Sequence, residues 1–175
     1  MKKIILLFSL AFIISIAADA QKRKLPADTT VITKHSTTIN GVSINYTAQT
    51  GTQPVWGEDD NAIASLYYTY YTRDDVRDRD SRPLVISFNG GPGSASVWMH
   101  IAYTGPQILK IDDEGYPVQP YGVKENPFSI LDVADIVFVN PVNTGYSRMI
   151  PQEEGKMPDK KMFFGINADI KYLAE

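Results

Sequence analysis

The sequence PLVISFNGGPGSASVW, residues 83–98, decides the expected fold. Its first part, from Leu84 to Phe88, is a short and almost continuously apolar run, which is typical of a strand buried on both faces in a parallel sheet. The next residues, Asn89 to Gly93, cannot continue a strand, because their glycines relax the limits on φ and Pro92 donates no N–H. The pattern therefore predicts a buried strand that ends in a rigid loop.

The composition of this loop is suited to binding negative charge. Parallel α/β sheets place their ligands at the carboxyl ends of strands, and outward-pointing backbone N–H groups there can stabilise the oxyanion formed during acyl transfer. A phosphate site is disfavoured, because the loop has neither a Gly-Lys-Ser/Thr ending nor GxGxxG spacing. Taken by themselves, these residue types fit a structural turn equally well.

Two motifs together resemble one enzyme family. NGGPGSAS, residues 89–96, and NPFSILDVADIVFVNPVNTGYSR, residues 126–148, resemble the serine carboxypeptidase family of α/β-hydrolase serine peptidases in sequence, order and separation. The resemblance extends from about His35 to the last residue. It implies an α/β-hydrolase fold, that is, a mostly parallel sheet with helices on both faces, preceded here by an antiparallel hairpin and incomplete as given.

The resemblance also implies roles for individual residues. The backbone N–H of Gly91 would be one oxyanion donor, and Asn89, with Gly90 beside it, would bind the C-terminal carboxylate of a peptide or protein substrate. The sequence departs from the family at Ser87, where many relatives have tryptophan, and at Asn143, where glycine is usual. Asparagine tolerates the left-handed φ that such a glycine would adopt. The resemblance implies no metal and no cofactor.

Ser94 and Ser96 are not expected to be nucleophiles. A hydrolase nucleophile normally lies in a GxSxG turn, and neither GPGSASV nor GYSRM completes that pattern. We therefore expect both serines to cap a short helix over residues 94–105, on which His100 is packed rather than catalytic. In the family, the nucleophile and the rest of the triad lie beyond the position that corresponds to Glu175.

These observations predict a function. The chain is expected to be the N-terminal portion of a secreted serine carboxypeptidase, which releases C-terminal residues through an acyl-enzyme, and to be inactive alone because it lacks the triad. An α/β-hydrolase-fold acyltransferase or esterase is an alternative, since fold does not fix function. A non-catalytic secreted binding module is another.

The N-terminal residues predict export. Residues 1–20 combine Lys2 and Lys3, an apolar run and a small-x-small site, which is typical of a cleaved signal peptide and leaves no stable membrane anchor. Residues 21–34 are polar and expected to be mobile, and residues 35–175 form the hydrolase portion. The destination would be periplasmic or extracellular. The net charge of -3 offers no basic surface for nucleic acid, and the absence of cysteine excludes disulfides.

Further elements follow from periodicity and turn signals. His35 to Ala48 reads as a hairpin around Asn40-Gly41, Ile63 to Thr72 as a strand, and Ile136 to Val139 as a buried strand. The segment from Arg73 to Arg82 carries dense charge of both signs and is expected to be an exposed loop.

Two predictions concern the second half of the chain. Asp132 and Asp135 are expected to serve in caps and turns beside the strand that follows them, rather than in a metal site. At the C-terminal end, helical spacing predicts one apolar face formed by four residues: Phe163, Ile166, Ile170 and Leu173.

Overall fold

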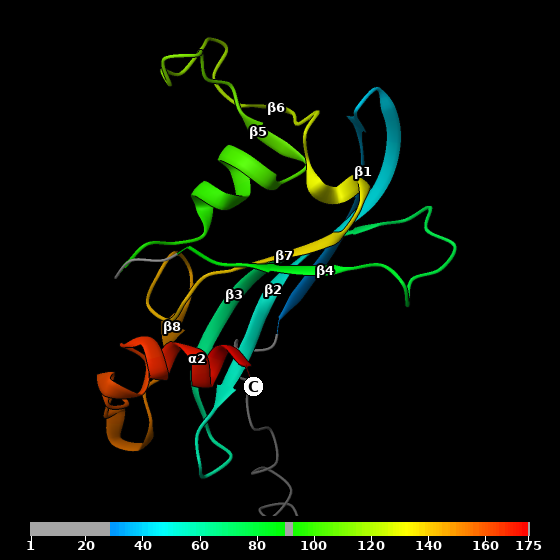
Figure 1. Cartoon of the computed structure of the whole chain (residues 1–175). Coiled ribbons are helices and arrows are strands. Elements are labelled where there is room, and N and C mark those ends of the chain that lie inside the picture. Colours follow the sequence, from blue (N-terminus) through cyan, green and yellow to red (C-terminus); the bar gives the residue numbers. More distant parts are fainter. Residues whose placement is uncertain (1–28, 90–92, 175) are drawn as a thin grey trace, which may run out of the picture.

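The computed structural model describes residues 29–89 and 93–174. Within these residues, a mixed sheet of six strands has the order β1-β2-β3-β7-β4, and β8 pairs with β3 (Figure 1). The strands of this sheet are β1 (Thr30–Ile39), β2 (Val42–Trp56), β3 (Ala62–Arg73), β4 (Leu84–Ser87), β7 (Asp135–Val139) and β8 (Arg148–Met149). A small second sheet pairs β5 (Gln107–Leu109) with β6 (Val123–Glu125).

The directions of the strands correct the prediction of a mostly parallel sheet. In the described part of the chain, β4 and β7 are the parallel pair, while β1–β2, β2–β3, β3–β7 and β3–β8 are antiparallel. The reason is the length of the connections, because tight turns join antiparallel neighbours and a parallel pair needs a long crossover. The first three strands follow one another through short turns, whereas the chain between β4 and β7 includes a helix and the small sheet.

The N-terminal hairpin is confirmed and is longer than predicted. Asn40 and Gly41 form its turn with φ of 49° and 79°, the left-handed values that a two-residue turn of this kind needs. β1 begins at Thr30, which pairs with Gly51, so the strand starts before the predicted boundary at His35. The predicted signal peptide over residues 1–20 and the first part of the predicted mobile segment lie outside the described residues.

The strand that opens the glycine motif forms, but it is not buried as predicted. Leu84, Ile86 and Phe88 are 54%, 59% and 51% exposed, whereas Ile136 and Phe138 of the neighbouring β7 are 1% and 3% exposed. The reason is position in the sheet: β4 lies at the end of the strand order and pairs with β7 alone among the described strands. An open edge of apolar residues is prone to pair with other chains.

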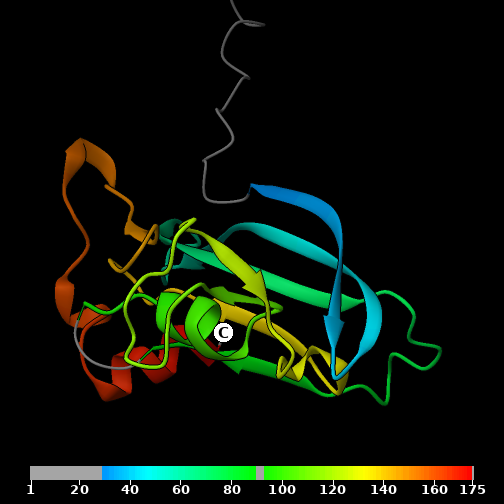
Figure 2. The same cartoon turned by 90° about the horizontal axis from the view of Figure 1, so that it is seen from above.

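One helix packs on each face of the sheet (Figures 1 and 2). The π-helix η1 (Met99–Thr104) contributes His100, whose ring stacks on Phe138 of β7 with centroids 4.5 Å apart. On the opposite face, α2 (Ile166–Ala174) contributes Tyr172 to a core cluster that includes Leu66 of β3. The described residues thus place a short helix on each face of a mixed sheet that has few helices. None of the helices in the described ranges is long and apolar enough to cross a membrane.

The C-terminal helix differs from its predicted apolar face. Ile166 and Ile170 are 81% and 61% exposed, while Tyr172 is buried and Leu173 packs against the same core cluster. Phe163 is buried but precedes the helix, directly after the short 3-10 turn η4 (Lys160–Met162). The predicted face is therefore wrong in two ways: Phe163 lies before the helix, and within the helix Tyr172 and Leu173, rather than Ile166 and Ile170, pack against the core.

The remaining short elements are two further 3-10 turns. They are η2 (Ile130–Asp132), directly before β7, and η3 (Glu153–Gly155). In η2 the hydroxyl of Ser129 accepts the N–H of Leu131, and Leu131 is fully buried in the core cluster beneath the hairpin.

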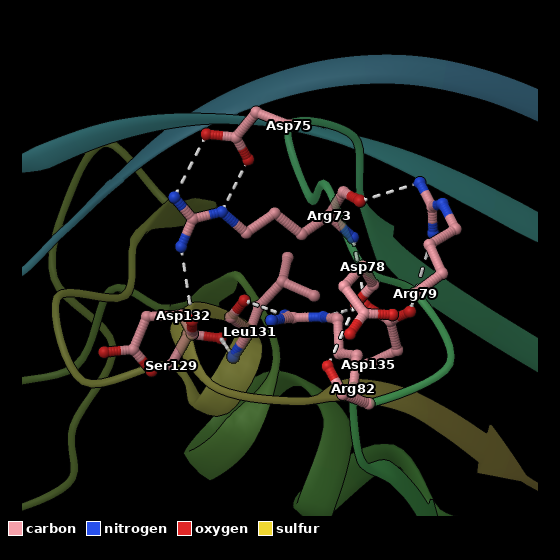
Figure 3. Close-up of polar contacts among 10 residues, drawn as sticks. Arg73, Asp75, Asp78, Arg79, Arg82, Ser129, Leu131, Asp132 and Asp135 are labelled. Atoms are coloured by element: carbon pink, nitrogen blue, oxygen red, sulfur yellow. Dashed lines mark hydrogen bonds and ion pairs between the residues drawn. The ribbon is translucent and has the colours of Figure 1, made fainter.

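Ion pairs fix the beginning of β4 against the beginning of β7 (Figure 3). Arg82 Nε lies 2.7 Å from Asp135 Oδ1 and its Nη2 donates to the carbonyl of Leu131 at 2.6 Å. Asp135 Oδ1 also accepts the backbone N–H of Arg73 at 3.1 Å, and Arg79 lies 3.8 Å from Asp135 Oδ2. The side chains of Arg82 and Asp135 are 8% and 10% exposed, so both charges are buried and paired.

This network corrects two predictions. Asp135 acts as the acceptor at the centre of a buried ion-pair network rather than in a cap or turn, and the segment from Arg73 to Arg82 is not simply an exposed loop. Asp132, by contrast, lies in η2 as expected for a turn residue, with its carboxylate accepting from Asn40 Nδ2 at 3.1 Å and its carbonyl from Arg73 Nη1 at 3.2 Å.

The buried pair should dominate the stability of this end of the sheet. Arg82→Met leaves the buried Asp135 carboxylate without its closest cation, so we expect the free energy of unfolding to fall by about 3 kcal/mol. Urea unfolding of residues 21–175, followed by circular dichroism, measures the loss. Arg77→Met, in the same loop at an exposed position, is the matched control and should change stability by less than about 0.5 kcal/mol. Equal losses in the two variants would contradict the assignment.

Candidate functional site

The candidate site lies where the parallel strands β4 and β7 end. The last pair between them is Ser87 with Phe138, so the carboxyl ends of the two strands lie at the same end of the sheet. On the β4 side the chain continues into Asn89 and the glycine motif, and on the β7 side into Asn140 and the loop up to Ser147. Ligands of α/β proteins bind at such an edge.

Asn89 is held through both its backbone and its side chain. Its backbone N–H donates to Ser96 Oγ at 3.1 Å, and its side-chain Nδ2 donates to Ser94 Oγ at 2.5 Å. The other two residues predicted for the site, Gly90 and Gly91, lie outside the described residues, so the oxyanion donor stays a prediction. Gly93, two residues after Gly91, has a φ of 80°, in the left-handed region that favours glycine.

The prediction that the Ser96 side chain caps the helix is wrong. Helical residues begin at Val97, directly after Ser96, and the backbone carbonyl of Ser96 accepts the N–H of His100 at 3.0 Å, but the Ser96 hydroxyl does not bond to a free N–H of the helix. Instead, the Ser96 hydroxyl accepts from Asn89 and donates to the carbonyl of Val139, while its backbone N–H donates to Asn140 Oδ1 at 3.0 Å. Ser96 is 2% exposed and fully bonded, which does not suit a nucleophile. It connects the ends of two strands, which no local sequence signal indicates.

The loop after β7 is fixed to β3. Asn140 donates its backbone N–H to the carbonyl of Tyr67 at 2.9 Å and accepts the hydroxyl of Ser147 at 2.6 Å. The same Ser147 oxygen accepts the N–H of Tyr67 at 2.8 Å. Gly145 has a φ of 50°, and a Cβ on it would lie 2.3 Å from Asn140 Nδ2, so a side chain does not fit there. Asn143 has a φ of 62°, which confirms the predicted left-handed conformation.

A cavity of about 420 Å³ lies between the sheet and α2, and another of about 330 Å³ opens beside Asn89. The second is bounded by Asn89, by the loop after β7 through Thr144, and by the N-terminal part of α2 through Asp169. Its walls are mainly apolar, with these polar groups along them, as in many small-molecule sites. In the described part of the chain, no group of three or more histidine, cysteine, aspartate or glutamate side chains is arranged to hold a metal ion.

His100 is packed, as predicted. Its Nε2 lies 2.6 Å from the hydroxyl of Tyr71, and its ring stacks on Phe138. Burial lowers the pKa of His100 from 6.5 to about 4 and raises the pKa of Tyr71. Both groups are therefore neutral at pH 7, and His100 serves the packing of η1 on the sheet. The sequence had placed it on this helix without indicating Tyr71 as its partner.

The profile of one protein family, described as serine carboxypeptidase, matches residues 44–163. This range includes both sequence motifs, the two parallel strands and the loops at their carboxyl ends. The chain belongs to the serine carboxypeptidase family.

Individual relatives agree with this membership. The chain is 31% identical over 107 residues to the pheromone-processing carboxypeptidase KEX1 of Saccharomyces cerevisiae, covering 61% of this chain and 13% of the relative. It is 32% identical over 101 residues to serine carboxypeptidase-like 36 of Arabidopsis thaliana, covering 57% and 20%. Carboxypeptidase Y of Saccharomyces cerevisiae is 30% identical over 110 residues, covering 62% and 18%.

A solved structure supports the fold. The crystal structure of Kex1Δp, a prohormone-processing carboxypeptidase from Saccharomyces cerevisiae, matches with a TM-score of 0.51 and 26% sequence identity, covering 75% of this chain and 27% of that chain. The chain thus spans between 13% and 20% of the length of the three curated relatives. Over that part, it shares the arrangement of a serine carboxypeptidase, an α/β-hydrolase.

Because His100 is buried in its neutral form, the free energy of unfolding should fall at acidic pH. As pH falls, the unfolded chain takes up a proton on this histidine below about pH 6.5, while the folded chain does so only near pH 4, so stability is lost across that interval. The pKa difference corresponds to a loss of about 3 kcal/mol. Urea unfolding at pH 7.5 and pH 4.5 should show a smaller acid loss in His100→Gln than in the unchanged chain.

The control for this experiment is the chain's other histidine, His35, which is exposed on β1. His35→Gln should keep the acid loss of the unchanged chain, because this variant retains the buried His100. Identical pH dependence of His100→Gln and the unchanged chain would show that His100 is not buried in its neutral form.

Proposed function

We propose that this chain supplies the oxyanion donor and the carboxylate-binding residue of an exported serine-type carboxypeptidase. The observation that carries the proposal is the family match across both motifs, together with Asn89 fixed at the carboxyl edge of the sheet beside a cavity. The substrates would be peptides or proteins with a free C-terminus, and the place of action periplasmic or extracellular.

In the proposed reaction, this chain binds the substrate and stabilises the oxyanion, and a serine nucleophile attacks the peptide bond. The scissile carbonyl is attacked by a serine, and the backbone N–H of Gly91 donates to the oxyanion that forms. The Asn89 amide donates to the terminal carboxylate of the substrate, which places the last peptide bond at the site of attack. A neutral amide contributes a hydrogen bond and no net charge, so selectivity for a free carboxylate depends on how firmly the amide is positioned.

The 175 residues contain no GxSxG sequence. Because Ser96 is buried and fully bonded, and His100 is packed against Tyr71 and Phe138, neither supplies a nucleophile and base pair. The acyl-enzyme therefore requires a serine from outside this sequence.

An esterase or acyltransferase on the same fold is the second candidate. The observation that favours it is Ser87, which stands where many relatives have tryptophan and is buried beside the start of the glycine motif. A small hydroxyl at this position changes the neighbourhood of Asn89, which is the residue proposed to recognise the carboxylate.

The decisive experiment begins with the coding DNA beyond the codon for Glu175. If the frame continues, the complete product is purified and tested for release of the C-terminal amino acid from an N-blocked dipeptide, with the dipeptide methyl ester as a parallel substrate. Rapid cleavage of the free acid and covalent labelling by a fluorophosphonate support the carboxypeptidase. Cleavage of the ester alone, or acyl transfer to an added alcohol, would favour the second candidate.

Asn89→Ala in the complete product should lower kcat/KM for the free-acid dipeptide by about 10- to 100-fold, the range for losing a hydrogen bond to a charged group. The methyl ester, which lacks the carboxylate, should lose much less. Asn45→Ala, at an exposed position on β2, is the matched control and should change neither rate. An equal loss on acid and ester would exclude a role for Asn89 in carboxylate binding.

Residues 21–175 alone should show no turnover of either substrate, because they contain no nucleophile for an acyl-enzyme. The measurement is the same dipeptide assay at high protein concentration, with the complete product as the positive control. Turnover that persists after purification to constant specific activity, and that is lost in Ser94→Ala or Ser96→Ala, would overturn this expectation.

A further inference from the structure

We infer that Ser96 is a positioning residue for Asn89, acting as a hydroxyl bridge between the ends of β4 and β7. This inference rests on the function proposed above, because it assigns the means by which the carboxylate-binding residue is held. Ser96 itself touches neither substrate nor reacting atoms.

The Ser96 hydroxyl acts as a donor and an acceptor between the two strand ends. At the carboxyl end of the β4–β7 pair, the Asn89 N–H and the Val139 C=O each need a partner. Ser96 Oγ accepts from the first and donates to the second. A hydroxyl can donate and accept at once, whereas alanine offers neither function. The ladder between the two strands is therefore continued through one side chain.

Ser96 is itself held by a buried hydrogen-bond network. The Ser96 N–H donates to Asn140 Oδ1, and Asn140 is in turn tied to β3 through Tyr67 and Ser147. Ser96 and Ser147 are 2% and 0% exposed, so water does not compete for these bonds. Asn89 is thus connected through Ser96 to two strands of the sheet.

Two different serines hold the side chain and the backbone of Asn89. Ser94, which is only partly buried, accepts from the Asn89 side-chain Nδ2 and so orients the amide. Ser96 instead contacts the Asn89 backbone and sets where the residue lies. Removing the Ser96 hydroxyl should let the whole residue move relative to a substrate, and displacements of this kind reduce reactivity strongly.

Ser129 offers a matched control. It is 2% exposed, like Ser96, and its hydroxyl also joins two backbone groups, donating to Thr104 C=O at 3.0 Å and accepting from Leu131 N–H at 3.3 Å. It lies directly before η2, at the opposite end of β7 from Asn89. Ser129→Ala should therefore cost similar stability without affecting the candidate site.

The test measures a ratio in the complete gene product: kcat/KM for the free-acid dipeptide divided by kcat/KM for its methyl ester. Ser96→Ala should lower this ratio about tenfold. Ser129→Ala should leave the ratio unchanged, although its melting temperature falls by a similar amount. An unchanged ratio in Ser96→Ala, with an active parent, would overturn the inference. Should Ser96→Ala fail to fold, Ser96→Cys keeps the volume with a much weaker donor and acceptor, and the same criterion applies.

A second measurement separates this inference from the proposed function. Amide hydrogen exchange of the segment containing Asn89 should be faster in Ser96→Ala than in the parent and in Ser129→Ala, because the Asn89 N–H loses its acceptor. A parent that cleaves neither dipeptide overturns the proposed function, and the exchange result then decides the inference. Unchanged exchange at Asn89 would show that Ser96 does not hold it.

Discussion

The parallel pairing of β4 with β7 is the constraint on which the geometry of the candidate site depends. β4 has no other partner strand among the described residues, and its apolar side chains are largely exposed, so burial does little to hold it. Polar interactions at both ends of the β4–β7 strand pair stabilise it instead. At the beginning, Arg82 and Asp135 form a buried ion pair, and at the end the Ser96 hydroxyl joins Asn89 to Val139. The ion pair and the hydrogen bonds depend on direction as well as distance. They therefore restrict the position of Asn89 more than apolar contacts would.

Much of the local structure was predictable from local patterns. Asn40-Gly41 predicted the hairpin turn, because few other residue pairs adopt left-handed φ at two successive positions. The β-branched run before Asn140 predicted β7, and asparagine at position 143 was expected to adopt the left-handed φ that it has. In each case the determining interaction lies within a few residues of the signal.

The features that sequence did not predict depend on distant parts of the chain. The apolar run over residues 84–88 predicts a strand, but it does not show that β4 lies at the edge of the sheet. The four apolar residues predicted to form one face of the C-terminal helix do not show where α2 begins. Asp135 pairs with Arg82, just before β4, and the Ser96 hydroxyl bonds to Asn89, just beyond β4, and to Val139 at the end of β7. Composition identified these residues as polar, but only the fold determines which buried groups they satisfy. The two predicted glycines of the site, Gly90 and Gly91, lie outside the described residues.

The order of the strands has a consequence for the route by which the chain folds. β1, β2 and β3 follow one another through short turns, so their contacts are local and can form early. The pairing of Leu84 with Asp135 must instead close a long loop that contains η1 and the small sheet, which costs chain entropy before any contact compensates for it. The three N-terminal strands therefore provide a template, on which β7 docks through Tyr68 to Tyr71 before β4 can be added. The edge at which Asn89 is placed is thus expected to be the last part of this sheet to assemble.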